Sequence, residues 1–496
     1  MELFGETLQF ATAFFLLLAL ALALSFEFVN GFHDTANAVA TVIYTNTLKP
    51  TVAVIWAGCW NLAGVLWSSG AVAYSIVALL PVELVLNAGS GAGFAMIFSL
   101  LISAILWNVG TWYLGLPASS SHTLIGSIMG VGVANSLMAG HGWLAGINWT
   151  KAQEIFTYLI ISPIFGFVFA GLLLLILKFL VRREDLYQAP KKDTPPPFWI
   201  RCVLVVTCTL VSFFHGSNDG QKGMGLIMLI LVGLVPGAFA LNMATAPADS
   251  QKAIVQLQQV ATALQPMTAG TVLGHEEAVS DLTAYVTPTG PKVSARVYAA
   301  IVAECQFVSE SLARSANIKD VPRGERTSLR TDVYLIDEGI GKLLKKKLVT
   351  DATAVKELGT AKKSLDQITK YIPLWVKVAV SLALGCGTMI GWKRIVVTVG
   401  EKIGKSHLTY AQGASAEIIA ASTIGIADYM GFPVSTTHVL SSGIAGTMAA
   451  NRSGLQKETL ISILLAWVLT LPVCVFLGAT LFSASLYVMF HIFGIQ

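Results

Sequence analysis

The chain has 496 residues, of which 54% are hydrophobic and only 12% are charged, about half the charged fraction of a typical soluble domain. This composition excludes an ordinary soluble enzyme or binding module, and the net charge of +4 gives no indication of a nucleic-acid partner. The six cysteines are scattered and lie mostly in apolar segments, so they indicate neither a disulfide framework nor a zinc site.

Long apolar runs predict an all-α integral membrane protein. A helix needs about 20 apolar residues to cross a bilayer core. Runs of about this length or longer occupy residues 9–26, 159–181 and 459–490. The first run does not read as a cleavable signal peptide, because no Lys or Arg precedes it. We expect 10–12 membrane segments in total.

Charge divides the chain into apolar and polar parts. Residues 241–371 hold 16 Lys/Arg and 14 Asp/Glu, and no run within them is long enough to span a membrane. We interpret them as a small helical domain without a catalytic motif. The predicted parts are a first transmembrane half over 1–181, a linker over 182–197, the start of a second half over 198–240, the soluble insertion over 241–371 and the remainder of the second half over 372–496.

Basic residues near membrane segments predict orientation, because cytoplasmic loops carry an excess of Lys and Arg. The linker 182–197 and the insertion 241–371 are both basic, whereas the N-terminus is acidic. We therefore expect the insertion in the cytoplasm and the N-terminus outside. The basic segment 391–406 conflicts with this scheme, because a single span from residue 372 would place it outside.

Two motifs occur twice along the chain. NGFHDTANAVA (30–40) matches HGSNDGQKGMG (215–225) at an offset of 185 residues, and GLPASSSHTLIG (115–126) matches GFPVSTTHVLSS (431–442) at an offset of 316. The offsets differ by 131, which is close to the length of the insertion. The transmembrane part is thus predicted to consist of two homologous halves. Combined with the predicted orientation, the halves should be inverted, with interrupted or re-entrant helices, as in secondary transporters.

The second motif pair predicts two helix starts that bind an anion. Pro117 and Pro433 are expected in the first helical turn, and free N–H groups and the positive dipole end favour an anion there. The expected ligands of one tetrahedral oxyanion are Ser119, Ser120, Ser121, Ser435, Thr436 and Thr437. The alternative is that these residues only cap and join membrane helices. His122 and His438 could titrate, contact the anion, or be ordinary hydrogen-bonded helix residues.

The first motif pair places Asp34 and Asp219 inside apolar segments, where a carboxylate by default marks an ion or proton path. Asn37 shares a helix face with Asp34, and the two offer oxygen ligands for Na⁺ or a divalent ion, or a protonatable acid. Lys222 stands at the position equivalent to Asn37. It could neutralise Asp219, attract the anion, or form a purely structural buried ion pair.

Other polar residues and glycines in the spans complete the predictions. Glu417 is a candidate proton or cation site, whereas Asn61 is as well explained by helix packing. Glu27 and Asp428 lie at segment ends, where solvation is the simpler account. The glycines at positions 31, 216 and 220 are expected to let the helices break and expose carbonyl groups for cation ligation.

At these motifs the chain resembles the inorganic phosphate transporter (Pit) family. GFHDTANA and GSNDGQKG stand for the family's Asp-containing element, and PASSSHT and PVSTTHV for its Pro-x-Ser/Thr element. The resemblance covers both membrane halves. It implies a phosphate symporter with inverted repeats, essential acids at Asp34 and Asp219, and phosphate ligands in the Ser/Thr motifs.

The departures from the family pattern concern the cation. His33 replaces an Asn that the second half retains as Asn218, and Asn61 stands where sodium-coupled members have a glutamate, although Glu417 is present. Low-affinity bacterial members resemble this layout and are taken to move neutral divalent-metal phosphate with protons. Proton coupling is therefore the prediction, with Na⁺ as the alternative.

Two other functions are alternatives to phosphate symport. A carrier of another tetrahedral oxyanion would use the same helix starts, whereas a membrane enzyme acting on phosphoryl groups would need clustered basic residues or metal-binding carboxylates at one membrane face. We expect no enzymatic activity and no bound cofactor. The expected partners are inorganic phosphate and the lipid bilayer of the bacterial inner membrane, and the sequence leaves open whether the chain forms a homodimer.

Overall fold

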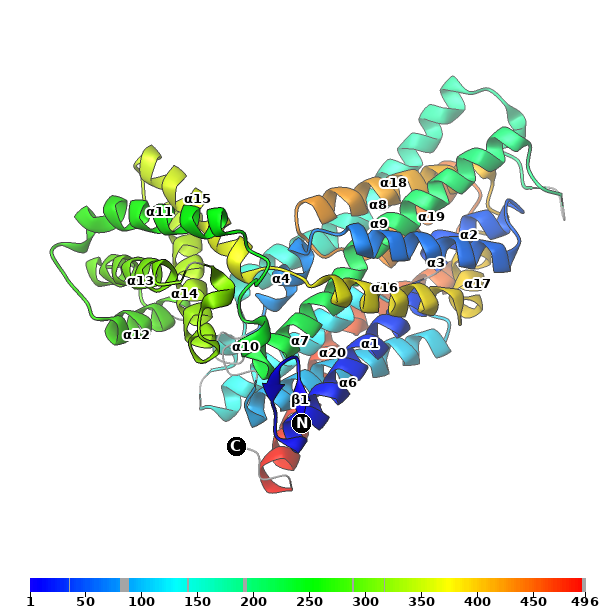
Figure 1. Ribbon diagram of the computed structural model, residues 1–496. Helices are drawn as coiled ribbons and strands as arrows, with labels where there is room; N and C mark the ends of the chain where they lie inside the picture. The colour runs from blue at the N-terminus through cyan, green and yellow to red at the C-terminus, as the bar shows by residue number, and fades with distance from the viewer. Residues whose placement is uncertain are drawn as a thin grey trace. The chain divides into compact units, whose positions relative to one another are not determined.

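The computed structural model describes residues 1–34, 36–80, 89–140, 142–190, 194–287, 290–315 and 317–492, with the backbone alone at residues 36 and 37. The described chain is almost entirely helical (Figure 1), so the predicted all-α fold is confirmed. Its only strands are β1 (Glu2–Leu3) and β2 (Glu6–Thr7), which form an antiparallel pair.

The chain divides into two compact units. The insertion unit comprises Met1–Leu17, Pro81–Gly93 and Met228–Ile372, and the membrane unit comprises Leu18–Leu80, Phe94–Ile227 and Pro373–Gln496. Three of the unit boundaries fall inside helices, namely α1 (Phe10–Asp34), α6 (Gly91–Tyr113) and α9 (Phe198–Leu234).

The remaining helices follow in chain order. The membrane unit contains α2 (Ala36–Tyr44), α3 (Pro50–Trp67), α4 (Ala71–Val77), nearly all of α6 (Gly91–Tyr113), α7 (Ser120–Met138), α8 (Trp149–Leu180), α16 (Leu374–Met389), α17 (Lys393–Glu401), α18 (Tyr410–Tyr429), α19 (Thr436–Ala450) and α20 (Lys457–His491). The insertion unit contains α10 (Pro236–Phe239), α11 (Pro247–Leu264), α12 (His275–Val286), α13 (Ala295–Ala313), α14 (Arg326–Lys345) and α15 (Ala352–Thr369). Short 3-10 turns are η1 (Trp143–Gly146), η2 (Glu184–Leu186), η3 (Gln265–Thr268), η4 (Ile318–Asp320) and η5 (Arg323–Glu325).

Six stretches of the described chain are long and apolar enough to cross a membrane, or up to seven if α15 and α16 are counted together. They are Phe10–Tyr44, Pro50–Trp67, Gly91–Tyr113, Trp149–Leu180, Phe198–Leu234 and Lys457–His491. This is fewer than the 10–12 segments expected from the sequence. Helices such as α7 and α18 account for part of the difference. They are at least 18 residues long, but their Ser, Gly and other polar residues make them less apolar than an ordinary membrane-spanning helix.

Large apolar side chains on α8 and α20 face outward. Ile160 and Phe179 on α8, and Val468 and Phe476 on α20, are each more than 60% exposed. A water-soluble protein rarely exposes so many large apolar side chains together, whereas a bilayer solvates them. The outer surface of these helices therefore fits contact with lipid.

Helices of each predicted half pack on helices of the other half, and the two pairs are equivalent. Helix α7 packs on α20, and α19, which stands 316 residues after α7, packs on α8. Equivalent glycines bring the backbones close: a Cβ at Gly130 would lie 2.1 Å from the Val475 carbonyl oxygen, and one at Gly446 would lie 2.0 Å from that of Phe167. Only glycine permits this approach, so both contacts are built into the repeat.

Helix α9 runs without interruption through Gly216 and Gly220, so the helix break expected there is wrong. Gly216 instead allows close packing on α3, because a Cβ would lie 2.1 Å from the Asn61 carbonyl oxygen. Gly31, its equivalent in the first half, meets α16 in the same way, 2.3 Å from the Leu384 carbonyl oxygen. These glycines serve helix packing rather than cation ligation by exposed carbonyl groups.

The insertion unit has a hydrophobic core of its own. Helices α11–α15 are green to yellow in Figure 1 and pack around buried side chains that include Leu257, Ile301, Ile336 and Leu358, all fully buried. A buried acid on α14, Asp337, is paired with the Lys362 and Lys370 ammonium groups at 2.5 and 2.9 Å.

Candidate functional site

The two Ser/Thr motifs form helix starts of the same local design. Ser119 and Ser435 are the N-caps of α7 and α19, and each side-chain oxygen accepts a hydrogen bond from the backbone three residues later, at 3.2 and 3.1 Å. The helices therefore begin at Ser120 and Thr436, and the expectation that Pro117 and Pro433 lie in the first helical turn is wrong. We call residues 119–121 the first tip and residues 435–437 the second tip.

The two tips lie in direct contact, although they are more than 300 residues apart in sequence. The Ser121 hydroxyl donates to the Val434 carbonyl at 2.7 Å, and the rings of His122 and His438 have centroids 4.7 Å apart. All six tip side chains are buried. Two N-terminal helix ends thus converge inside the membrane unit, and each contributes the positive end of its helix dipole.

Asp34 joins the two tips. Its carboxylate accepts a hydrogen bond from Ser120 of the first tip at 3.0 Å and one from Thr437 of the second tip at 2.6 Å. His33 lies 3.1 Å away through Nδ1, while its Nε2 is within 3.1 Å of the Thr111 hydroxyl. The site therefore already holds one negatively charged oxygen group between the tips. The side chain of Asn37 lies outside the described residues.

Asn218 positions the second tip. Its amide donates to the Phe432 carbonyl at 3.1 Å, and its oxygen accepts from the Val434 backbone at 3.5 Å. His438 is buried and stacks on Trp467, whose indole in turn donates to the Pro117 carbonyl of the segment before the first tip. These contacts fix the two chain segments that lead into the helices.

Asp219 has a cation of its own. Lys222, one turn later on α9, lies 2.8 Å from the Asp219 carboxylate, and both side chains are buried. Of the roles predicted for Lys222, neutralisation of Asp219 fits this contact directly. The Asp219 carboxylate lies next to His215 and Lys222, whereas that of Asp34 accepts from the tips, so the two motif aspartates differ in their partners.

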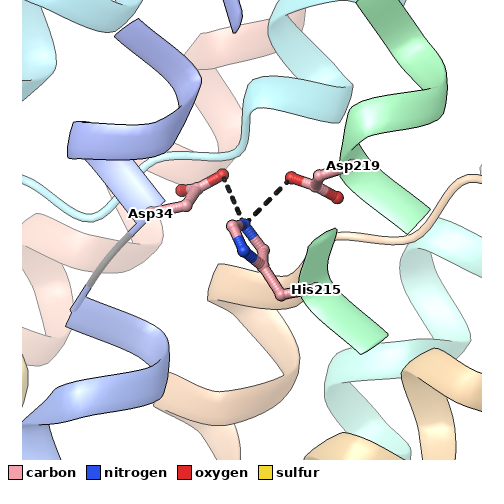
Figure 2. Close-up of side chains that lie close together, drawn as sticks. All are labelled: Asp34, His215 and Asp219. Carbon is pink, nitrogen blue, oxygen red and sulfur yellow. Dashed lines mark ion pairs between the residues drawn. The ribbon is translucent and has the colours of Figure 1, made fainter. Parts of the chain in front are cut away.

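His215 lies between the two aspartates and was not singled out from the sequence. Figure 2 shows its imidazole between the carboxylates, with Nε2 at 4.0 Å from Asp34 and 3.4 Å from Asp219. Spacing could have revealed it, because His215 precedes Asp219 by four residues and therefore shares its helix face. Single oxygen or nitrogen atoms of Asp34, His215 and Asp219 all lie within 4.8 Å of one another, close enough to share a proton or a metal ion.

A hydrogen-bond chain fixes the tautomer of His215. The Thr388 hydroxyl donates to the Leu384 carbonyl, so its oxygen is the acceptor for the Asn61 amide at 2.9 Å. The Asn61 carbonyl oxygen must then accept from His215 Nδ1, which is also 2.9 Å away. Asn61 is thus part of the site and not only a packing residue. Nε2 is left facing the carboxylates of Asp34 and Asp219.

Glu27 is a second residue that sequence reasoning undervalued. It lies inside α1 and is fully buried, so the expected solvation at a segment end is wrong. Its side chain packs against α9, where a Cβ at Gly223 would lie 2.3 Å from Glu27 Cγ, and Lys222 is close enough to act on its charge. Glu27 stands seven residues before Asp34, two helical turns along one face, a spacing that could have revealed it.

Glu417 and Asp428 occupy separate surroundings. Glu417 is fully buried and accepts hydrogen bonds from the hydroxyls of Thr41 and Thr207, a set of three hard oxygen ligands on three helices. Asp428 near the end of α18 accepts from Ser217 and Gln221, both at 2.6 Å. Protein donors, and not solvent alone, therefore satisfy Asp428.

The comparisons with known proteins agree with this picture. A family model described as the phosphate transporter family matches residues 30–478. The low-affinity inorganic phosphate transporter PitA of Escherichia coli (strain K12) is 43% identical over 97% of this chain and 98% of its own length. That of Buchnera aphidicola subsp. Acyrthosiphon pisum is 40% identical over 95% and 96%.

One solved structure extends the similarity to the fold. It is titled "The sodium-dependent phosphate transporter", is 18% identical in sequence and superposes with a TM-score of 0.53. The match covers 95% of this chain and 98% of the other. At this identity the match supports a shared fold and carries no conclusion about the cation.

Proposed function

The chain belongs to the phosphate transporter family, and we propose that it imports inorganic phosphate as a proton-coupled symporter by alternating access. It is a multi-pass membrane protein and a transporter, not an enzyme. The observation that carries the proposal is the carboxylate of Asp34, which receives one hydroxyl hydrogen bond from each tip.

Phosphate would bind where the tips meet. Ser120 and Thr437 already donate to the Asp34 carboxylate, and α7 and α19 both begin at this point, so the positive ends of two helix dipoles lie beside it. Ser119 and Ser435 keep the helix starts in place as N-caps. Binding through hydroxyls and helix dipoles, without a lysine or arginine in either tip, suits a carrier that must also release its cargo.

The negative charge of the site explains why phosphate transport would be coupled to a cation. A phosphate anion at the tips would meet the carboxylate of Asp34, with Asp219 and Glu27 nearby and Lys222 as the one lysine beside them among the described residues. Moving uncompensated charge against a membrane potential costs about 2.3 kcal/mol per elementary charge per 100 mV. Protonation of Asp34 would remove one negative charge and free the hydroxyls of Ser120 and Thr437 for phosphate.

His215 provides a place for the transferred proton. Its Nδ1 is committed to Asn61, so a second proton must sit on Nε2, between Asp34 and Asp219. From that atom a proton can pass to Asp34 without crossing bulk solvent. We assign His215 the role of holding the coupling proton when Asp34 is charged.

The packing of helices from each half on helices of the other half supports alternating access. Equivalent helices of the two halves make equivalent contacts with the opposite half, α7 with α20 and α19 with α8. Two related halves around one midplane site can adopt two equivalent states by rocking. We therefore propose that the two halves are inverted relative to each other, that the N-terminus lies outside, and that residues 241–371 lie on the cytoplasmic side of the bacterial inner membrane.

Two groups of side chains support alternative coupling ions. Glu417 with Thr41 and Thr207 offers hard oxygen ligands of the kind that suits Na⁺. The cluster of Asp34, His215 and Asp219 could instead receive a divalent ion that travels with phosphate. Either alternative uses the same tips for phosphate.

Uptake of labelled phosphate into proteoliposomes tests the proposal. We expect accumulation with an inward proton gradient in Na⁺-free buffer, and faster accumulation when Mg²⁺ or Zn²⁺ is present if metal phosphate is the cargo. Uptake that requires an Na⁺ gradient would overturn proton coupling. Efficient competition by sulfate at equal concentration would identify a general oxyanion carrier, and no uptake under any gradient would contradict phosphate symport altogether.

A further inference from the structure

A second cluster of metal-ligating side chains lies in the insertion unit. His275 is the first residue of α12, Glu304 lies on α13 and Asp332 on α14. One nitrogen or oxygen atom of each lies within 4.8 Å of the other two, and His275 Nδ1 is 2.9 Å from Glu304 Oε1. Three separate helices thus direct one ligand each to the same point.

The carboxylates of this cluster are buried without a cationic partner. Glu304 is fully buried and Asp332 is 2% exposed, and the second oxygen of each has no hydrogen-bond partner among the described residues. Asp337, one turn and a half later on α14, is equally buried but has two lysines. A buried carboxylate oxygen without a partner is costly and demands an explanation, such as an ion.

The histidine is oriented and accessible. Its ring stacks on Phe307, with centroids 3.6 Å apart and an interplanar angle of 14°, so the imidazole plane is fixed. Phe307 follows Glu304 by three residues on α13 and therefore lies on the same helix face. The side chain of His275 remains 33% exposed, which leaves a path from solvent to the two buried acids.

We propose that His275, Glu304 and Asp332 bind a divalent transition-metal ion such as Zn²⁺ in the insertion unit. One imidazole and two carboxylates form a ligand set that suits Zn²⁺ or Mn²⁺, whereas Ca²⁺ and Mg²⁺ prefer oxygen ligands alone. Bonds of about 2.1 Å would separate tetrahedral ligand atoms by about 3.4 Å, which these side chains can reach by small rotations. The exposed side of His275 leaves a fourth position for water.

The electrostatics of the two acids favour the binding of a cation. Burial raises the pKa of the Glu304 carboxyl to about 7 and that of Asp332 to about 7, and the charge of Glu304 raises the latter further. Two neighbouring acids therefore resist being charged together. A bound divalent ion would supply the charge that the surrounding side chains do not.

Zinc binding by the full chain in detergent tests the site. The protein is stripped with a chelator, incubated with Zn²⁺, desalted and assayed for metal by mass spectrometry. Because the membrane cluster could also hold an ion, all variants are made in an Asp34→Asn background. We expect this parent to retain about one Zn²⁺ per chain, and Glu304→Gln or Asp332→Asn to lower the affinity at least about tenfold.

Matched variants separate metal binding from misfolding. Glu310→Gln removes an exposed carboxylate from the same helix α13 and should bind Zn²⁺ as the parent does. His275→Gln changes the solvent-facing ligand and should lose binding while the helical circular dichroism signal stays unchanged. The proposal is overturned if the parent binds no Zn²⁺, or if folded His275→Gln binds it with unaltered affinity.

Discussion

The two motif aspartates occupy equivalent positions in the sequence repeat but have different partners. Asp34 receives hydroxyl groups from both tips and has histidines as its only nearby basic groups among the described residues. Asp219 is paired with the Lys222 ammonium at 2.8 Å. The two halves thus share the motif aspartate, but only the second half pairs it with a lysine.

The difference suggests a division of roles between the halves. An acid with a permanent counter-ion can keep its charge while other groups change state. An acid held by neutral hydroxyls that phosphate also needs cannot, because anion and carboxylate would compete for the same donors. We therefore infer that Asp34 changes its protonation during transport, whereas Asp219 and Lys222 maintain the charge balance of the site.

Removing the counter-ion should have the largest effect. Lys222→Met leaves Asp219 and Glu27 without their nearby ammonium group in a buried environment. Breaking a buried ion pair from one side typically costs about 3–5 kcal/mol. We expect a large fall in thermal stability in detergent and loss of uptake.

A second substitution distinguishes charge balance from packing. Lys222→Met combined with Asp219→Asn should recover most of the stability, since the uncompensated charge is then removed from both partners. Lys377→Met is the control, because this membrane-helix lysine donates a hydrogen bond to the Ser68 carbonyl and forms no ion pair with a carboxylate of the described residues. If the double variant is no more stable than Lys222→Met alone, the ion pair is not the source of the loss.

Asp34→Asn should separate coupling from binding. Asparagine resembles a permanently protonated Asp34, so the tips should still accept phosphate, but no proton can be released. We expect proton-driven net uptake to fall by about 100-fold, at the upper end of typical coupling free energies. Phosphate exchange between preloaded vesicles and medium should persist. Normal net uptake would show that Asp34 is structural, and loss of exchange as well would move it into the binding site itself.

Much of the architecture follows from local sequence signals. Apolar runs predict the membrane helices, and the equal spacing of two motif pairs predicts equivalent halves, which α7 and α19 match at their N-caps. The described chain contains six, or up to seven, long apolar helices, whereas the sequence predicts 10–12 membrane segments, because polar helices such as α7 and α18 are also part of the membrane unit. The break expected at Gly216 and Gly220 failed because glycine also serves close helix packing, and only the neighbouring helix α3 reveals which role applies.

The sequence motifs predict which residues belong to the candidate site, but not which of them contact each other. Asp34, Ser120 and Thr437 stand in motifs, but their mutual hydrogen bonds join segments 86 and 403 residues apart. The sequence analysis does not single out His215 and assigns Glu27 to a solvated segment end, although both share a helix face with a motif aspartate. The role of Asn61 depends on Thr388, 327 residues away, and no local pattern could have indicated it.

Truncating one hydroxyl from each tip should weaken phosphate binding in parallel. Ser120→Ala and Thr437→Ala each remove one donor that now contacts Asp34, and a hydrogen bond to a charged group contributes about 1.5–3 kcal/mol. We expect the KM for phosphate uptake to rise at least about tenfold in each. Ser127→Ala, two turns further along α7, is the control and should leave KM unchanged. An effect in only one tip would argue against a shared site.

His215→Gln should have the smallest effect and tests how the two aspartates communicate. Glutamine can still donate to Asn61, but it cannot carry a proton between Asp34 and Asp219. We expect uptake to fall about fivefold, a coupling loss near 1 kcal/mol, and its dependence on external pH to flatten. His33→Gln is the matched control, because the two ring nitrogens of His33 contact Asp34 and Thr111 and do not connect Asp34 with Asp219. Equal changes in both pH profiles would mean that the bridge between the aspartates has no special role.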